Sequence, residues 1–306
     1  MKGCGFEVIR FEVVIMGESD VLDEVFERFL KGAHVFRDRE IMRHDYIPDR
    51  LPQELPHREE QIRCLGGIAA PILHGSRCSN IFIYGKTGTG KTAVVKHVLS
   101  RLTVKAQDLG APVEVCYVNC RLSGTEYRIL STLCNVLNVR VPFTGLALGE
   151  VFDRLEAGLD ARRLLLVTVL DEIDALVKSR GDILLYELTR INENLRHSRA
   201  SLVGISNDLQ FKDLLDPRVL SSLSEEEIVF RPYDASELQD ILWNRARSAF
   251  HDGVLSDGAV RLCAALAAAE HGDARRALDL LRVAGELAER EGAEVVVEDH
   301  VRRAEK

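Results

Sequence analysis

The chain has 306 residues, a formal net charge of −8 and a composition that is 46% hydrophobic and 29% charged, as in ordinary soluble globular proteins of one or two domains. No apolar run reaches the ~18 residues that a membrane-spanning helix needs, which argues against a membrane segment. The acidic balance also argues against a broad basic face for nucleic acid, although it leaves room for a local patch.

The N-terminal residues, 1–19, form an extension without a recognisable pattern. Glu7, Arg10 and Glu12 interrupt its apolar residues, so it is not a signal peptide. The chain has seven cysteines, an odd number without a C-x-x-C pair, which favours a reducing cytoplasm. Cys116 and Cys120 are more typical of buried thiols than of half a zinc site.

A helix is predicted over 21–30, where apolar residues recur at helical spacing before Gly32. The stretch 33–56 follows, with three prolines and with four arginines that are offset by Asp38, Glu40, Asp45 and Asp49. We interpret it as a solvated or ion-paired segment and not as a basic arm.

A phosphate-binding loop is predicted at "GKTGTGKT", between an apolar strand at 80–84 and a helix with one apolar face. Glycines let successive backbone N–H groups converge on a phosphate, and the helix that follows presents its positive end to the same anion. Lys91 would reach the β- and γ-phosphates, and the Thr92 hydroxyl would ligate Mg²⁺. The alternative is a glycine-rich turn that binds nothing. The predicted nucleotide contacts are Gly85, Lys86, Thr87, Gly88, Thr89, Gly90, Lys91, Thr92 and Ala93.

Strands and helices alternate from residue 58 to residue 232. Strands are predicted at 80–84, 113–117, 164–170, 201–206 and 226–230, and helices at 58–74, 126–137 and around 151–155. This alternation indicates an α/β domain with a five-stranded parallel sheet covered on both faces, which we assign to residues 20–232. Helices at about 235–250, 256–270, 274–290 and 296–305 then predict a small all-α domain, 233–306.

Two carboxylates follow the wholly apolar strand 164–170, at the end of the strand where an open α/β sheet binds its ligand. Asp171 would hold Mg²⁺ together with Thr92, and Glu172 would orient and deprotonate the attacking water. The alternative is a strand that ends in a polar turn. Because the pair follows a phosphate loop, we expect hydrolysis as well as binding.

Four more polar residues are candidates, and three of them have a plainer alternative. Asn207, at the tip of the fourth strand, would contact the γ-phosphate and the water, or it begins a turn with Asp208. Arg218 would reach a neighbouring subunit's γ-phosphate, or it is a surface arginine. Arg245 falls on the apolar face of helix 235–250, where we expect an anionic partner. Arg275 opposes the dipole of its helix and lines up with Leu278 and Leu281, which indicates a phosphate opposite it or an intramolecular salt bridge.

These residues together resemble the AAA+ ATPases and, more narrowly, the archaeal origin-recognition replication initiators. The narrower likeness rests on "HDYIPDRL", "LPHREEQI", "YGKTGTGKTAVVKHV", "CYVNCR", "LDEIDAL", "LVGISNDLQF", "LDPRVLSSLSEEEIVFRPY" and "GDARRALDLLRVAGELA", and covers about residues 20–305.

The resemblance implies roles for named residues. Asn207 and Arg275 look like the two sensor residues, and Arg218 lies where such proteins carry the inter-subunit arginine. Tyr233, Arg245, Tyr46 and Ile47 look like further nucleotide contacts. "NVRVPFTG" resembles the helical insertion that initiators press against DNA, and its candidate DNA contacts are Arg140, Phe143, Thr144 and Gly145.

The resemblance therefore implies a cytoplasmic, nucleoid-associated initiator that uses ATP/ADP and Mg²⁺ as a slow switch. Its expected partners are double-stranded origin DNA, other initiator subunits and the replicative helicase. Such proteins usually continue with a winged-helix domain, and nothing follows Lys306 in this sequence, so we expect weak DNA binding. A remodelling, clamp-loader-like ATPase and a truncated regulatory module are the alternatives.

Overall fold

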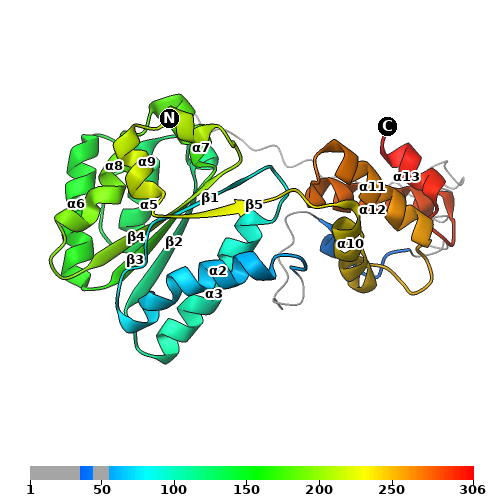
Figure 1. Ribbon diagram of the computed structural model, residues 1–306, viewed down its shortest axis with the longest axis horizontal. Helices are drawn as coiled ribbons and strands as arrows, with labels where there is room; N and C mark the ends of the chain where they lie inside the picture. The colour runs from blue at the N-terminus through cyan, green and yellow to red at the C-terminus, as the bar shows by residue number, and fades with distance from the viewer. Residues whose placement is uncertain (1–34, 44–54) are drawn as a thin grey trace, which may run out of the picture.

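The structure is a computed structural model that describes residues 35–43 and 55–306. The N-terminal extension, the predicted helix at 21–30 and the candidates Tyr46 and Ile47 lie outside these residues. The described chain forms two parts, a base that contains the only sheet found in these residues and a lid of helices (Figure 1).

The base is built on a parallel sheet with the strand order β2-β3-β4-β1-β5. The strands are β1 (Ile81–Gly85), β2 (Val113–Asn119), β3 (Leu165–Asp171), β4 (Arg199–Ser206) and β5 (Glu226–Phe230). All five predicted strands are confirmed. The interior strand β3 is buried along its whole length, as its largely apolar sequence requires when helices cover both faces.

Helices cover the two faces of the sheet as separate layers (Figure 1). One layer holds α2 (Glu59–Ala69), the 3-10 turn η2 (Ala70–His74) and α3 (Lys91–Asp108). The other holds α4 (Cys120–Ser123), α5 (Glu126–Val136), α6 (Leu148–Arg162), α7 (Ile173–Arg180), α8 (Ile183–Arg190), η3 (Ile191–Glu193), η4 (Phe211–Leu214) and α9 (Pro217–Leu223). The predicted helix 58–74 changes to a 3-10 turn near its end because Pro71 has no N–H to continue the α-helical pattern.

The lid consists of four helices around their own apolar core. They are α10 (Ala235–Ala249), α11 (Asp257–Glu270), α12 (Ala274–Glu291) and α13 (Glu298–Ala304). Side-chain caps mark three of the helix starts: Asp234 forms a capping box with Glu237, Ser256 caps α11, and Asp273 caps α12. The predicted all-α arrangement is confirmed.

Residues 35–43, which include the 3-10 turn η1 (Arg39–Met42), pack on the lid although they lie within the predicted α/β domain, 20–232. Val35 and Met42 are fully buried, and the rings of Phe36 and Phe250 lie 4.5 Å apart. The buried carboxylate of Glu289 accepts hydrogen bonds from the backbone of Val35 and Phe36 and pairs with Arg39 at 2.8 Å. The predicted ion pairing is present, whereas this apolar burial was not predicted.

The described cysteines are free thiols. Cys116 and Cys120 are buried, and burial raises their pKa to about 11 and about 12, so both stay protonated at neutral pH. Their prediction as buried thiols is confirmed. No helix in residues 35–43 and 55–306 is long and apolar enough to cross a bilayer.

Candidate nucleotide-binding site

The predicted phosphate loop connects β1 to the N-terminus of α3. Gly88 and Gly90 have φ angles of 71° and 88°, a conformation that glycine adopts without steric cost. Neighbouring groups also leave no room for a side chain: a Cβ on Gly88 would lie 1.7 Å from the Asp273 carboxylate, and one on Gly90 would lie 2.9 Å from the Tyr233 hydroxyl. Both neighbours belong to the lid side of the molecule, so the loop is shaped by the lid as well as by its own sequence.

Lys91 is held at the centre of this loop. Its side chain is 4% exposed, and its Nζ donates to the carbonyls of Gly85 and Lys86 at 2.8 and 2.7 Å. Burial lowers the pKa of Lys91 to about 8, an effect that Asp171 partly offsets and that the charge of Arg275 reinforces. A bound phosphate would favour the charged form, so this buried cation is suited to an anionic ligand.

Asp171 ends β3 beside the loop, where the parallel register places its strand next to both β2 and β4. Its Oδ2 accepts hydrogen bonds from the hydroxyls of Thr92 at 2.7 Å and Tyr117 at 2.6 Å. Hydroxyl and carboxylate oxygens are ligands that suit Mg²⁺, which is usually held by one or two protein groups with phosphates and water. The Thr92–Asp171 pair fits that pattern, and residues 35–43 and 55–306 contain no cluster of three or more metal-binding His, Cys, Asp or Glu side chains.

Glu172 follows Asp171 in the left-handed region, with φ 54°. This unusual backbone turns its side chain away from the strand, toward the end of β2. There Glu172 accepts a hydrogen bond from Asn119 Nδ2 at 3.2 Å and lies 3.7 Å from Arg121. Sequence reasoning missed Asn119, although a polar residue that ends a strand beside Asp171 was a usable signal.

Asn207 follows β4 at the same edge of the sheet. Asp174 accepts hydrogen bonds from the Asn207 backbone at 3.2 Å and from Ser206 Oγ at 3.1 Å, and these fix the turn. The register pairs Tyr84 with Ser206, so Asn207 emerges beside the start of the phosphate loop. The structure therefore brings Lys91, Asp171 and Asn207 to one edge, as predicted, and it also contains the turn that was the alternative for Asn207.

The lid closes one side of this site through the first turn of α12. The backbone N–H of Ala274 donates to the carbonyl of Gly88 at 3.2 Å, and the Asp273 carboxylate caps the helix while it lies against Gly88. The charge of Arg275 also reaches this site. It lowers the pKa of Lys91, and it partly offsets the rise that burial and Asp171 cause in the pKa of Tyr117.

The predicted orientation of Arg275 needs a correction. Leu278 and Leu281 are buried as predicted, but Arg275 itself is exposed. It sits in the first turn of α12, which extends beyond the lid core toward the loop. No carboxylate of the described residues forms an ion pair with it, so the salt-bridge alternative is not observed there.

Comparison with known proteins agrees with this geometry. Residues 74–210 match a family described as "AAA domain", and residues 239–306 match "Cdc6 AAA+ ATPase-type lid domain". The ORC1-type DNA replication protein of Thermococcus onnurineus is 54% identical over 292 residues, which cover 94% of this chain and 69% of the relative. The same kind of protein from Pyrococcus abyssi is 54% identical over 293 residues, with the same coverage. The chain belongs to the family of ORC1-type DNA replication proteins, within the AAA+ ATPases.

Two solved structures share the fold. The structure of the Aeropyrum pernix ORC1 protein in complex with DNA has a TM-score of 0.80 and 53% sequence identity, and the match covers 89% of this chain and 69% of that one. The Aeropyrum pernix ORC2 protein, in ADPNP–ADP complexes, has a TM-score of 0.75 and 26% identity over 89% of this chain and 72% of that one.

Of the other predicted nucleotide contacts in this ORC1-type chain, the structure brings Tyr233 to the phosphate loop and shows a backbone partner for Arg245. Tyr233 is 5% exposed, with its hydroxyl beside Gly90. Leu238, Ile241 and Leu242 form the buried face of α10, as predicted. Arg245 is half-buried on that helix, and its guanidinium donates to the carbonyl of Ile41 at 3.3 Å. An anionic partner for Arg245 stays a prediction.

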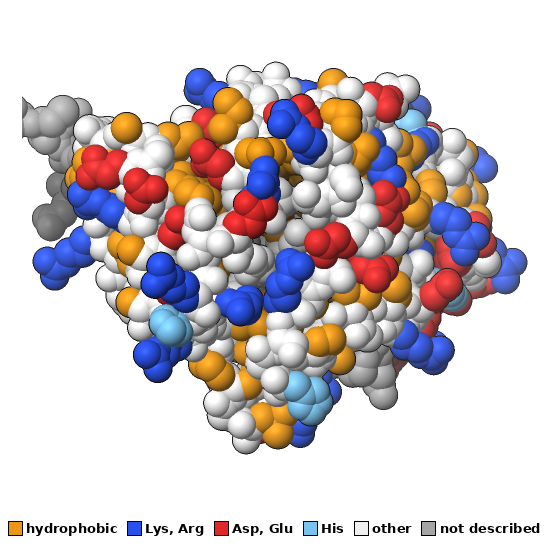
Figure 2. Space-filling view, turned by 60° about the vertical axis from the view of Figure 1, so that its left-hand side comes forward, with side chains coloured by type: hydrophobic (Ala, Val, Ile, Leu, Met, Phe, Trp, Pro, Cys, Tyr) orange, Lys and Arg blue, Asp and Glu red, His pale blue; other side chains and the backbone are white. Residues whose placement is uncertain are grey.

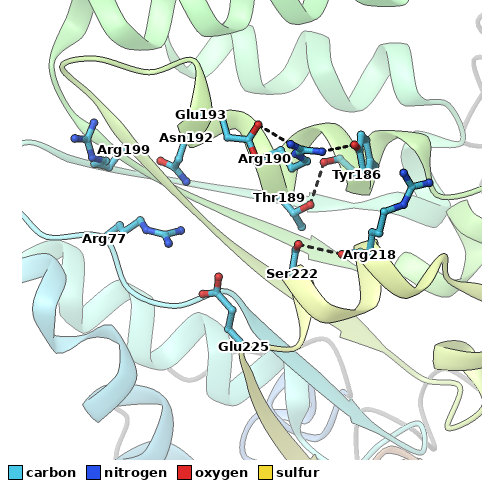
Figure 3. A pocket seen from close by; sticks show the side chains of 10 residues that line it. All are labelled: Arg77, Tyr186, Thr189, Arg190, Asn192, Glu193, Arg199, Arg218, Ser222 and Glu225. Carbon is cyan, nitrogen blue, oxygen red and sulfur yellow. Dashed lines mark hydrogen bonds and ion pairs between the residues drawn. The ribbon is translucent and has the colours of Figure 1, made fainter.

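Arg218 lies in a separate hollow of this ORC1-type chain, whose lining contains no phosphate-loop residue (Figure 3). Its side chain is 74% exposed, pairs with Asp216 at 3.0 Å and lies over the ring of Tyr186. The hollow has a volume of about 560 Å³, and Arg77, Arg190 and Arg199 also line it. The exposure of Arg218 and its ion pair with Asp216 fit the surface-arginine alternative, and its role toward a neighbouring subunit stays a prediction.

The candidate DNA contacts lie in the connection between α5 and α6. The resemblance implied a helical insertion here, but residues 137–147 themselves form no helix; they link two helices that pack together. Tyr127 donates to the carbonyl of Pro142 at 2.6 Å and Arg154 to that of Arg140 at 3.4 Å, and these bonds hold the connection. Phe143 is 83% exposed at its tip.

Proposed function

We propose that this chain is an ATP-switched DNA replication initiator, in which bound ATP joins base and lid and slow hydrolysis releases them. We also propose that the base spans residues 20–232 and the lid 233–306, with 1–19 as an extension; within the first range, residues 35–43 pack on the lid. The observation that carries the proposal is that one site is built from both parts: Lys91 and the Thr92–Asp171 pair come from the base, and the first turn of α12 comes from the lid.

The base supplies the groups that bind the triphosphate. The backbone N–H groups of the loop and the positive end of α3 would face the β- and γ-phosphates, and Lys91 would add a fixed cation. Thr92 and Asp171 are the side chains that would hold Mg²⁺. Bound with ATP, Mg²⁺ neutralises charge on the phosphate oxygens.

Glu172 is the proposed general base for hydrolysis. Asn119 and Arg121 hold its carboxylate at the carboxyl edge of the sheet, where a water could lie between it and the γ-phosphate. Asn207, fixed by Asp174, would position that water. Arg275 would place its charge on the γ-phosphate and thereby couple the presence of that phosphate to the position of the lid.

DNA is the proposed partner of the exposed connection between α5 and α6. The likeness to a structure whose ORC1 protein is in complex with DNA supports this, as does Phe143, an aromatic side chain exposed at the tip. Figure 2 shows both signs of charge on the face that it presents, in keeping with a net charge of −8 and a local contact. Arg218 would meet the nucleotide of a neighbouring initiator subunit. Helicase loading and association with the nucleoid complete the proposal.

The test compares nucleotide states. Fluorescence anisotropy on an origin duplex, measured in ATP, in ADP and without nucleotide, should show tighter binding in one nucleotide state. In a separate single-turnover assay, the rate constant of ATP hydrolysis should be below about 1 per minute. Equal binding in all three conditions would contradict the switch. Rapid turnover, at or above about 1 per second, would favour a remodelling ATPase instead.

A further inference from the structure

Arg58 is a buried arginine directly before α2, and only 3% of it is exposed. Its Nε donates to the carbonyl of Thr89 in the phosphate loop at 2.9 Å. Its two terminal nitrogens donate to the carbonyls of Arg231 at 2.7 Å and His57 at 3.3 Å. The guanidinium also lies 3.8 Å from the centre of the Tyr233 ring and 5.6 Å from that of Phe230.

The charge of Arg58 is balanced in an unusual way. No carboxylate of residues 35–43 and 55–306 forms an ion pair with it; backbone carbonyls and ring faces replace the water that burial removes. Burying a guanidinium without an acid is unfavourable unless its donors are well satisfied. Here every nitrogen of the guanidinium has a carbonyl partner, and two of those carbonyls, Thr89 and Arg231, belong to different segments.

The segments that Arg58 joins are those that must move relative to one another when a lid opens. Thr89 belongs to the phosphate loop, and Arg231 belongs to the short hinge between β5 and α10. Tyr233 is at the lid end of that hinge, and its N–H donates to the carbonyl of Gly272 at 3.2 Å, one residue before the cap of α12. Figure 1 shows the start of α2 on the side of the base that faces the lid.

We infer that Arg58 is a positioning residue that couples the conformation of the phosphate loop to the angle of the lid. Arg58 contacts Thr89 in the phosphate loop on one side and Arg231 and Tyr233 in the hinge on the other. These contacts fix the position of the first turn of α12, which carries Arg275, relative to the loop. The inference rests on the proposed function, since it assigns the regulation of that same site. Arg58 touches no reacting group in this account.

The inference depends on the shape of the guanidinium group as well as on its charge. A guanidinium presents donors in fixed directions and a flat face for a ring, and so it reaches carbonyls of two segments while it stacks on Tyr233. A lysine has one compact ammonium group and cannot make these contacts together. Arg58→Lys therefore keeps the charge and removes the connection, and Arg58→Gln removes both.

The experiment measures hydrogen exchange at the amides of Tyr233 and Ala274, with and without saturating ATP, in the full chain. Affinity for a fluorescent ATP analogue and thermal stability without nucleotide are measured in parallel. The variants are Arg58→Gln and Arg58→Lys, and the control is Arg63→Gln, an exposed arginine on the same helix. In the parent and the control, ATP should slow exchange at both amides.

Both Arg58 variants should lose this ATP-dependent protection and bind the ATP analogue about tenfold more weakly, within the usual range of coupling between sites. Full protection by ATP in both variants, even with reduced thermal stability, would mean that Arg58 only stabilises the fold and would overturn the inference. A parent-like Arg58→Lys would also overturn it, because charge alone would then suffice. If the parent binds no ATP, the proposed function itself is wrong.

Discussion

Two groups of basic side chains in this molecule differ in how they are held. Lys91 and Arg58 are 4% and 3% exposed, and both donate to backbone carbonyls of the phosphate loop. Arg218 and Arg275 are exposed; the first pairs with a neighbour two residues away, and the second has no described carboxylate partner. The buried cations are fixed in place before any ligand arrives, whereas the exposed ones are free to change partners.

The difference separates binding from coupling. A preorganised cation lowers the cost of binding an anion because little ordering remains to be done. An exposed arginine gains little from a surface ion pair, so its charge becomes effective only when a second element brings an anion to it. We therefore expect the loss of Lys91 to remove binding and changes at the exposed arginines to alter how binding is transmitted. Arg58 is buried like Lys91, but it joins the loop to the hinge, so its loss should weaken binding and uncouple the lid.

The largest effect is expected for Lys91→Ala. It removes the buried cation that we propose binds the β- and γ-phosphates; the loss should cost about 2–5 kcal/mol of binding free energy and leave no measurable nucleotide binding. Calorimetric titration with ATP measures this, with Lys105→Ala, an exposed lysine near the end of α3, as the control. Unchanged ATP affinity in Lys91→Ala would contradict the assignment of the phosphate loop.

Glu172→Gln should leave ATP binding intact and slow ATP hydrolysis. ATP stays bound because the loop is untouched, while the single-turnover rate falls by about hundredfold or more, the usual contribution of a positioned base. Equal rates in variant and parent would show that another residue activates the water. Arg180→Gln, an exposed site at the end of α7, serves as the control.

Arg275→Ala tests an exposed cation. We expect ATP to bind about tenfold more weakly and to raise the melting temperature less, while stability without nucleotide changes by no more than about 0.5 kcal/mol. Arg276→Ala is a matched control, since the neighbouring arginine pairs with Glu270 at 3.3 Å. A large loss of stability in Arg275→Ala without nucleotide would show a structural role instead.

The smallest effect concerns DNA. The chain should bind duplex weakly, with a Kd at or above about 10⁻⁶ M at physiological salt and a salt slope of about −1 to −2. Arg140→Ala combined with Phe143→Ala should make that slope shallower by about 1. Lys105→Ala with Leu109→Ala removes an exposed cation and an exposed apolar side chain elsewhere, and should change nothing. Nanomolar binding by the parent, or a double variant that behaves like it, would place the contact elsewhere.

Sequence alone determined the parts that depend on local pattern. The apolar strands predicted a parallel sheet, and the carboxyl edge of such a sheet receives whatever polar residues end its strands. Lys91, Thr92, Asp171 and Asn207 could therefore be assigned to one edge before the structure was known. The lid helices were equally predictable, because caps such as Asp273 and the helical spacing of apolar residues act within a few residues.

Only the tertiary structure decided the contacts between distant segments. Arg58 meets Thr89 across 31 positions and Arg231 across 173, and Glu289 binds the backbone of Val35 across 254. Nothing in a local pattern shows that an arginine in a charged, helix-starting stretch is buried, or that a segment of the predicted α/β domain packs on the lid. The exposure of Arg275 was missed for a related reason: helical spacing shows which side of a helix a residue occupies, but the neighbouring elements determine where the covered part of that side ends.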